Sequence, residues 1–139
     1  MNIFDQLQNG FSKGKTPKNL EGFYKGTLAL VIPKYPIEYF GNFFSKFWLP
    51  WHGKTFTKNK GINNVSFGIT AFSFSTKITK GIQDNINLLQ LNYDVPENPS
   101  MIRKIIDELV EVEKNNYLGK AYLKEKDSYR LVAFFRLMK

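Results

Sequence analysis

The chain has 139 residues, a length that favours one domain built around a single core. Hydrophobic residues make up 42% and charged residues 23%, the balance of an ordinary globular protein, and the lack of cysteine excludes disulfides and thiol catalysis. The net charge of +8 arises in residues 1–80, which hold eleven lysines and three acids, because residues 81–139 hold nine basic and nine acidic residues.

The start of the chain, MNIFDQLQNGF, has neither the basic region nor the long apolar stretch of a signal peptide. No stretch reaches the roughly 18 apolar residues that a membrane-spanning helix needs. We therefore expect a soluble, cytoplasmic protein.

The first part of the chain predicts a helix, a loop and a strand. Residues 2–9 fit a short amphipathic helix, and residues 12–19 form a basic loop with glycine and proline. From Gly22 the hydrophobic pattern has a period of two, which predicts a strand that ends before Pro33. One face of that strand is expected to carry Tyr24, Leu28, Leu30 and Ile32.

The middle of the chain predicts a helix followed by two strands. Residues 37–49, IEYFGNFFSKFWL, have helical spacing and predict an aromatic helix that caps one end of the fold. Residues 54–58 predict a short strand, residues 58–64 a turn, and the alternating residues 65–79 a longer strand.

The last part of the chain predicts mostly strands. Residues 86–94 alternate as a strand does. The next segment is ambiguous, because its isoleucines fit one face of a helix whereas DELVEV alternates. We predict a helical turn at 99–106 and a strand at 107–114, and the alternative that 107–114 ends a helix stays open. Residues 117–124 and 129–139 predict two more strands.

Seven or eight strands joined by short turns favour a mainly β fold. A single antiparallel up-and-down barrel removes exposed sheet edges by closing on itself. One domain would span residues 1–139, with the N-terminal helix and basic loop at 1–19 and the aromatic capping helix at 37–49. The interior of an eight-stranded barrel has room for side chains and one small ligand.

Three segments carry a resemblance to known proteins. LEGFYKG (20–26) resembles a barrel-opening strand, PWHGKTF (50–56) matches W-x-G-K-x-F, and residues 93–124 hold a tyrosine, an Arg–Asp pair and a Leu-Gly-Lys strand. On these segments the chain resembles the lipocalin-like proteins of the GXWXG type, within the calycin-like group of small barrels. The residue two before Trp51 is Leu49 instead of the glycine of that motif. The resemblance implies a barrel that binds a small apolar ligand.

Aromatic residues are frequent, at 16%, and most fall on core-facing spacing, which favours a cavity lined by rings. The expected ligand is fatty-acid-like or isoprenoid-like, and the basic half would attract an anionic one. Gly119 and Ala121, on the inward face of 117–124, are expected to leave room for it. The residues expected to contact the ligand are Tyr24, Phe44, Trp48, Trp51, His52, Phe56, Phe72, Phe74, Tyr93, Arg103, Tyr117, Ala121 and Phe135.

A small barrel enzyme of decarboxylase, isomerase or cyclase type, acting on a phenolic or terpenoid acid, is the first alternative. It requires an inward carboxylate, such as Asp107 or Glu108, beside a tyrosine or Arg103. The chain has no catalytic-triad order and no nucleophile motif, so binding without catalysis is favoured and no catalytic residue is assigned.

Binding to nucleic acid or to an anionic membrane through a basic patch is the second alternative. The patch would consist of Lys13, Lys15, Lys18, Lys54, Lys58 and Lys60. Lysines outnumber arginines seventeen to three, which argues against sequence-specific nucleic-acid recognition, whereas weak membrane association stays open.

His52, the only histidine, has no cysteine or second histidine with which to hold a metal, so we expect no metal and no cofactor. Arg103 is expected either to point inward at a ligand or to pair with Asp107 on the surface. The expected partner is a small hydrophobic ligand, and the expected state is a monomer or homodimer.

Overall fold

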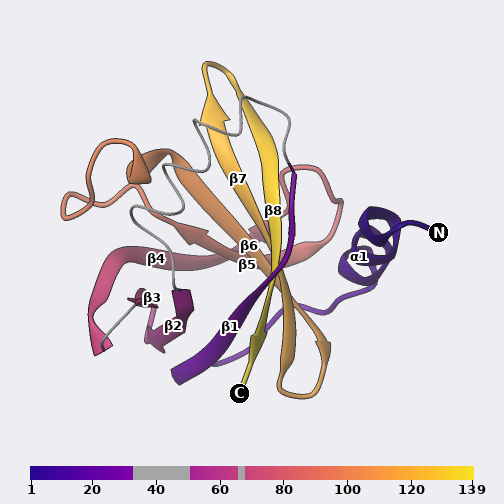
Figure 1. Ribbon diagram of the computed structural model, residues 1–139, viewed down its shortest axis with the longest axis horizontal. Helices are drawn as coiled ribbons and strands as arrows, with labels where there is room; N and C mark the ends of the chain where they lie inside the picture. The colour runs from indigo at the N-terminus through magenta and orange to yellow at the C-terminus, as the bar shows by residue number, and fades with distance from the viewer. Residues whose placement is uncertain (33–50, 66–67) are drawn as a thin grey trace.

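A barrel with one helix beside it is the main feature of the structure (Figure 1). The structure is a computed structural model, and it describes residues 1–32, 51–65 and 68–139. Its elements in these ranges are α1 (Ile3–Ser12), β1 (Gly22–Val31), β2 (Trp51–Thr57), β3 (Lys60–Val65), β4 (Thr70–Lys80), β5 (Asn87–Asn92), the 3-10 helix η2 (Ile102–Lys104), β6 (Ile105–Glu113), β7 (Asn116–Glu125) and β8 (Ser128–Met138).

The eight described strands form one closed antiparallel barrel. Each strand pairs with the next along the chain, and β8 pairs with β1 to close the sheet. At this seam Gly26 lies opposite Leu137. The predicted mainly β fold, an up-and-down barrel with an N-terminal helix, is confirmed. Among the described residues, no helix is long and apolar enough to cross a membrane.

Strand bounds differ from the prediction in the middle of the chain, where β2 begins at Trp51 instead of residue 54. Residues 60–64, which lie in the predicted turn at 58–64, belong to β3, since pairing with β2 and β4 overrides the weak strand propensity of the Asn-rich segment. Strand β4 begins at Thr70 and not at residue 65. The segment predicted as a strand at 107–114 lies in β6 up to Glu113, and the 3-10 helix η2 lies within the helical turn predicted at 99–106. The predicted capping helix at 37–49 lies outside the described residues.

Buried side chains form two main clusters, one on each side of the barrel wall. The inner cluster consists of Tyr24, Phe56, Phe74, Leu91, Tyr93, Ile102, Ile105, Leu109, Tyr117, Phe135 and Leu137. The outer cluster lies under α1 and consists of Leu7, Phe11, Leu88, Val110, Leu118, Tyr122, Leu131 and Phe134. Neighbouring residues of a strand alternate between the two, as Tyr117 and Leu118 do in β7.

A β-bulge changes which residues of β1 face the interior. The register with β8 shifts between Leu28 and Leu30, and an extra residue turns the following side chains to the other face. Tyr24 therefore lies in the inner cluster, whereas Leu30 and Ile32 pack against the outer cluster. The prediction that these residues share one face is wrong.

Helix α1 covers part of the outside of the wall (Figure 1). It begins at a cap in which Oδ1 of Asn2 accepts a hydrogen bond from the backbone N–H of Asp5 at 2.8 Å. Leu7 and Phe11 lie four positions apart, on the same helix face, and are 2% and 0% exposed. Their burial in the outer cluster helps to hold the helix against the barrel.

Candidate functional site

Three aromatic rings of the interior occupy the space above glycines of neighbouring strands. The pairs are Phe135 with Gly119, Phe74 with Gly61, and Trp51 with Gly26, and a Cβ on any of these glycines would overlap the paired ring. The rings therefore pack against the wall of the barrel. The prediction that Gly119 leaves room for a guest is wrong, because the ring of Phe135 fills that space.

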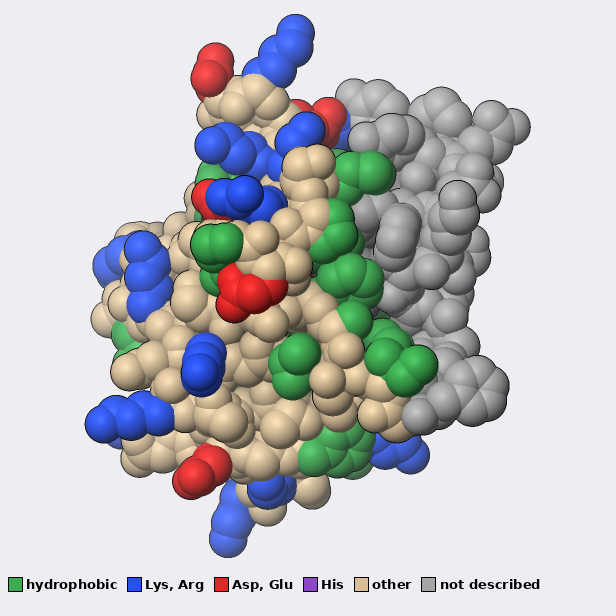
Figure 2. Space-filling model, turned by 90° about the vertical axis from the view of Figure 1, so that its left-hand side faces the viewer, with side chains coloured by type: hydrophobic (Ala, Val, Ile, Leu, Met, Phe, Trp, Pro, Cys, Tyr) green, Lys and Arg blue, Asp and Glu red, His purple; other side chains and the backbone are tan. Residues whose placement is uncertain are grey.

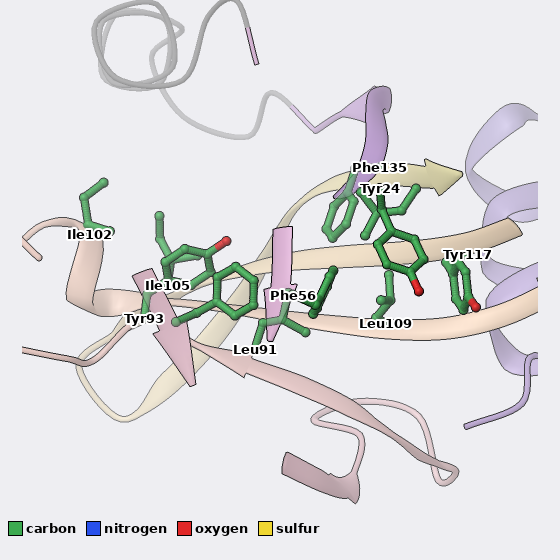
Figure 3. Close-up of a cluster of buried hydrophobic side chains, with 11 residues drawn as sticks. Tyr24, Phe56, Leu91, Tyr93, Ile102, Ile105, Leu109, Tyr117 and Phe135 are labelled. Carbon is green, nitrogen blue, oxygen red and sulfur yellow. The ribbon is translucent and has the colours of Figure 1, made fainter. Parts of the chain in front are cut away.

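Ring contacts run through the inner cluster. The centroids of Tyr24 and Phe56 lie 5.4 Å apart, as do those of Phe56 and Phe74 and those of Phe74 and Tyr93. Tyr117 continues the row, 5.6 Å from Tyr24. Figure 3 shows Tyr93 and Tyr117 toward opposite ends of this cluster. The interior is therefore lined by contacting rings along its length.

Lys54 is buried among these rings. It stands two residues before Phe56 in β2 and shares its inward face, and the whole residue is 1% exposed. Its Nζ lies 5.2 to 5.3 Å from four ring centroids, those of Trp51, Phe74, Tyr93 and Phe135. The faces of aromatic rings attract a cation, so these four rings form a favourable surrounding for the amine. We call the rings of Trp51, Phe74, Tyr93 and Phe135 the ring box.

Three polar side chains meet the Lys54 amine. Nζ donates to the hydroxyl of Tyr93 at 2.5 Å and to Oδ1 of Asn63 at 2.7 Å. It also lies 3.0 Å from Oδ2 of Asp107, and the Tyr93 hydroxyl donates to the same carboxylate oxygen at 3.0 Å. All four residues are buried. We call Lys54, Asn63, Tyr93 and Asp107 the interior polar group.

Burial changes the acidity of two members of this group. Loss of hydration lowers the pKa of the Lys54 amine, while the charge of Asp107 and its hydrogen bond oppose that lowering. Loss of hydration raises the pKa of Tyr93 well above its usual value, and the charge of Asp107 adds to the effect. Tyr93 therefore keeps its proton at neutral pH, and Lys54 releases its proton more readily than a lysine in water.

Asn63 connects the interior polar group to a strained point of the wall. Its Nδ2 donates to the Tyr93 hydroxyl and to the backbone oxygen of Phe72, both at 2.9 Å. Its Oδ1 also accepts from Nε1 of Trp51 at 3.0 Å. Phe72 has a φ of 63°, uncommon for a bulky residue, and lies where the register of β3 with β4 shifts. Asn63 thus holds both a bulge and the polar centre in place.

Most residues predicted to contact a ligand meet in one place. The inner cluster contains Tyr24, Phe56, Phe74, Tyr93, Tyr117 and Phe135, and Trp51 and Phe72 pack against it. Ala121 packs instead against the small cluster of Val132 and Ala133. Phe44 and Trp48 lie outside the described residues. Whether these side chains contact a ligand stays a prediction.

His52 and Arg103 are exposed and lie apart from the inner cluster. Arg103 forms an ion pair with Asp94 at 2.7 Å, so the predicted pairing with Asp107 is wrong, because Asp107 lies inside the barrel. In the part of the chain that the structure describes, no three His, Asp or Glu side chains come together as metal ligands.

Of the interior polar group, only Tyr93 was among the residues predicted to contact a ligand. Asp107 was considered only for the enzyme alternative and for pairing with Arg103, and Lys54 and Asn63 were not predicted to lie in the interior. The alternation of β2 places Lys54 inward with Phe56, but lysine is so rarely buried that the sequence favours a surface position. Asn63 has no such signal, because its strand reads as a turn. The buried position of Lys54 shows that its assignment to a basic surface patch is wrong.

The other lysines of the predicted patch are exposed, namely Lys13, Lys15, Lys18, Lys58 and Lys60. Figure 2 shows one face of the molecule, on which lysine and arginine side chains are spread out with acidic side chains between them. That face does not present a continuous basic surface. Nucleic-acid or membrane binding by these lysines stays a prediction.

A second set of buried polar side chains lies outside the wall, under α1. Nζ of Lys120 is 2.6 Å from Oδ2 of Asp84 and 4.7 Å from the ring centroid of Phe11. Nε2 of Gln8, in α1, donates to the other oxygen of Asp84 at 2.7 Å. Asp84 therefore joins α1 and the loop 81–86 to strand β7.

Glu108 belongs to this outer set. Its Oε2 accepts from the backbone N–H of Ile82 at 2.7 Å, whereas Oε1 has no hydrogen-bond partner among the described residues. Burial raises the pKa of Glu108 from 4.5 to about 7. The Ile82 hydrogen bond and the charge of Lys120 act in the opposite direction, and the charges of Asp84 and Asp107 raise it further.

The closed eight-stranded barrel fits a calycin-like fold. No protein-family model matches the sequence, and no curated protein matches it. Among solved structures, the crystal structure of a protein from Thermomonospora curvata covers 100% of this chain and 99% of that chain, with a TM-score of 0.52 and 11% sequence identity. At this identity the likeness shows the fold alone.

Proposed function

We propose that the barrel binds one small, mainly apolar molecule whose polar end meets Lys54 and Tyr93. The observation that carries the proposal is the fully buried Lys54 amine, held by Asp107 and surrounded by four rings. A buried ion pair is a poor source of stability, since well-packed apolar side chains of similar volume often stabilise a core as well or better. Buried groups with shifted pKa values are concentrated at functional sites.

The polar end of the ligand should be neutral. Lys54 and Asp107 carry opposite charges and lie 3.0 Å apart, so their charges largely cancel for any third group. A ligand carboxylate would also lie near the Asp107 carboxylate and be repelled by it. A hydroxyl or a carbonyl, by contrast, adds no charge, and it would replace Asn63 or Asp107 as the acceptor for one of the three N–H groups of Lys54. The apolar part would gain roughly 0.8 kcal/mol for each methylene that it buries.

We also propose that the chain belongs to the lipocalin-like family of the GXWXG type. Trp51, Lys54 and Phe56, which come from the W-x-G-K-x-F segment, all lie in β2 and contribute to the interior. The segment that carries the resemblance therefore supplies the amine, one ring of its box and one ring of the inner cluster.

Decanol, decanal and decanoate test the proposal, because they share one chain and differ only at the polar end. Binding to the full-length protein is measured by native mass spectrometry and by quenching of tryptophan fluorescence. We expect saturable binding with one molecule per chain, and tighter binding of decanol and decanal than of decanoate. An absence of saturable binding for all three, and for the isoprenoid alcohol geraniol, would contradict the proposal.

Lys54→Met tests the role of the amine, with Lys77→Met as the matched control on the exposed face of β4. Methionine keeps an unbranched apolar side chain but removes the donor. Loss of one hydrogen bond to the ligand should weaken decanol binding by about tenfold. Lys77→Met should leave it unchanged. Equal affinities for the two variants would show that the ligand does not meet Lys54.

Acid–base catalysis on a phenolic or terpenoid acid is a second candidate function. The specific observation in its favour is the hydrogen bond of 3.0 Å between the Tyr93 hydroxyl and the Asp107 carboxylate, inside the barrel and beside Lys54. An inward carboxylate beside a tyrosine is the arrangement that such a reaction needs. Turnover of a panel of phenolic and terpenoid acids, followed by mass spectrometry, tests it. Asp107→Asn should abolish any turnover and Lys77→Met should not.

A further inference from the structure

We propose that Lys54 forms a covalent imine with an apolar aldehyde or ketone that enters the barrel. The inference deepens the proposed function, on which it rests, by naming a carbonyl compound as the ligand class. The observations that support it are the position of the amine, the carboxylate beside it and the rings around it.

The environment of Lys54 suits a nucleophilic amine. An amine attacks a carbonyl only in its neutral form, and desolvation favours that form. Oδ2 of Asp107, 3.0 Å from Nζ, is placed to accept the proton that the amine must lose. The Tyr93 hydroxyl contacts both atoms, at 2.5 Å from Nζ and 3.0 Å from Oδ2, and keeps the two in position.

The reaction balances with the groups in the site. The Lys54 ammonium passes a proton to Asp107, and the free amine attacks the carbonyl carbon to form a C–N bond. The carbonyl oxygen takes a proton from Asp107 and becomes the hydroxyl of a carbinolamine. A second proton moves from nitrogen to the hydroxyl through Asp107, the C–O bond breaks, and one water leaves. The product is an iminium cation beside the Asp107 carboxylate, so the net charge of the site is unchanged.

The ring box suits the product as well as the free lysine. An iminium nitrogen at the position of Nζ stays 5.2 to 5.3 Å from the four ring centroids and keeps its cation–π contacts. It also keeps Asp107 as its counterion. The apolar part of the former aldehyde would lie against the rings of the inner cluster. Exclusion of water then slows hydrolysis of the imine.

Lys120 is an internal control in the same chain. It is also fully buried and ion-paired, at 2.6 Å from Asp84, but it lies outside the wall under α1. An aldehyde bound in the barrel reaches Lys54 and not Lys120. Modification of both lysines would indicate that the reagent unfolds the protein.

Reductive trapping tests the inference on the wild-type, full-length protein. The protein is incubated with decanal or with the isoprenoid aldehyde citral at one equivalent, reduced with cyanoborohydride, and analysed by intact mass and peptide mapping. We expect one adduct, with the mass of the aldehyde minus one oxygen, on the peptide that contains Lys54. Lys54 should be modified before the exposed Lys58 and Lys60, because desolvation lowers the pKa of its amine and favours the neutral form that attacks a carbonyl. The conjugated iminium from citral should also absorb at longer wavelength than citral itself.

The result that overturns the inference is separate from the one that overturns the proposed function. If decanol and decanal bind saturably but no adduct forms on Lys54, the imine is excluded and ligand binding stands. If neither binds, both fail. An adduct spread evenly over exposed lysines also overturns it. Asp107→Asn keeps the amine but removes the proton acceptor, so it should slow adduct formation by about tenfold or more, whereas Lys77→Met should form the adduct as fast as the wild type.

Discussion

In the interior of the barrel, the charge of Lys54 is stabilised by Asp107, and the charge of Asp107 is stabilised by Lys54. Lys54→Met leaves the Asp107 carboxylate buried without its cation, so we expect a loss of about 3 to 5 kcal/mol in the free energy of unfolding. The double variant Lys54→Met, Asp107→Leu removes both charges and should recover most of that loss. Urea unfolding measures the three proteins, with Lys77→Met as the control. Equal stability of Lys54→Met and the control would contradict this account of the site.

The second prediction at the scale of single residues concerns pH. The pKa of Glu108 in the folded protein is raised to about 7, so folding favours its protonated form. A raised carboxyl pKa contributes stability below the unfolded value of 4.5, and that contribution is lost as the pH rises toward 7. The loss should be about 3 kcal/mol.

Glu108→Gln tests this pH dependence, because glutamine can still accept from the backbone N–H of Ile82 but does not ionise. The groups that influence Glu108 are Lys120, Asp84 and Asp107, and Tyr122 lies in the same outer set. Urea unfolding at about pH 5 and about pH 8 should show the wild type losing stability and the variant losing less. Parallel pH profiles for the two proteins would place the titration elsewhere.

At the scale of elements, the pairs of rings and glycines decide how neighbouring strands pack. Gly119→Ala forces the ring of Phe135 away from β7 and toward Lys54, since a Cβ at residue 119 overlaps that ring. We expect a loss of about 1 to 3 kcal/mol. Gly10→Ala in α1 is the control, because its Cβ would lie an ordinary 3.7 Å from Leu118, and it should raise stability by up to about 1 kcal/mol. Thermal unfolding of both variants checks the prediction.

At the scale of the whole molecule, the seam between β1 and β8 closes the barrel with residues from opposite ends of the chain. Leu137, in this seam, is 0% exposed, and the next residue, Met138, is 53% exposed. Leu137→Asp would bury a charge in the inner cluster and should cost about 3 kcal/mol or more. Met138→Asp should cost far less. Near-ultraviolet circular dichroism and urea unfolding measure the two variants. Similar losses of stability in both would show that burial at the seam is not critical for folding.

The barrel could be predicted from the sequence because hydrophobic and polar residues alternate in most of its strands. Such alternation indicates one buried face, whichever strands pair with it. Positions that depend on partners could not be predicted. Asn63 lies in a segment with weak strand propensity, and only pairing with β2 and β4 makes it a strand. The bulge at Leu28 and Leu30 changes the face of later residues without any sequence signal. The alternation of β2 predicts that Lys54 lies on the buried face, but its charge favours the opposite assignment.

The ring that occupies the space above Gly119 belongs to a residue of the next strand, Phe135, so neither position can change freely without the other. Among related sequences we expect the two to vary together. A lineage that replaces Phe135 by a small side chain can accept a larger residue at 119, whereas a lineage that keeps the ring must keep the glycine. The pairs at Gly61 and Gly26 should follow the same rule. Three correlated pairs would then identify relatives that share the ring box even where overall sequence identity is low.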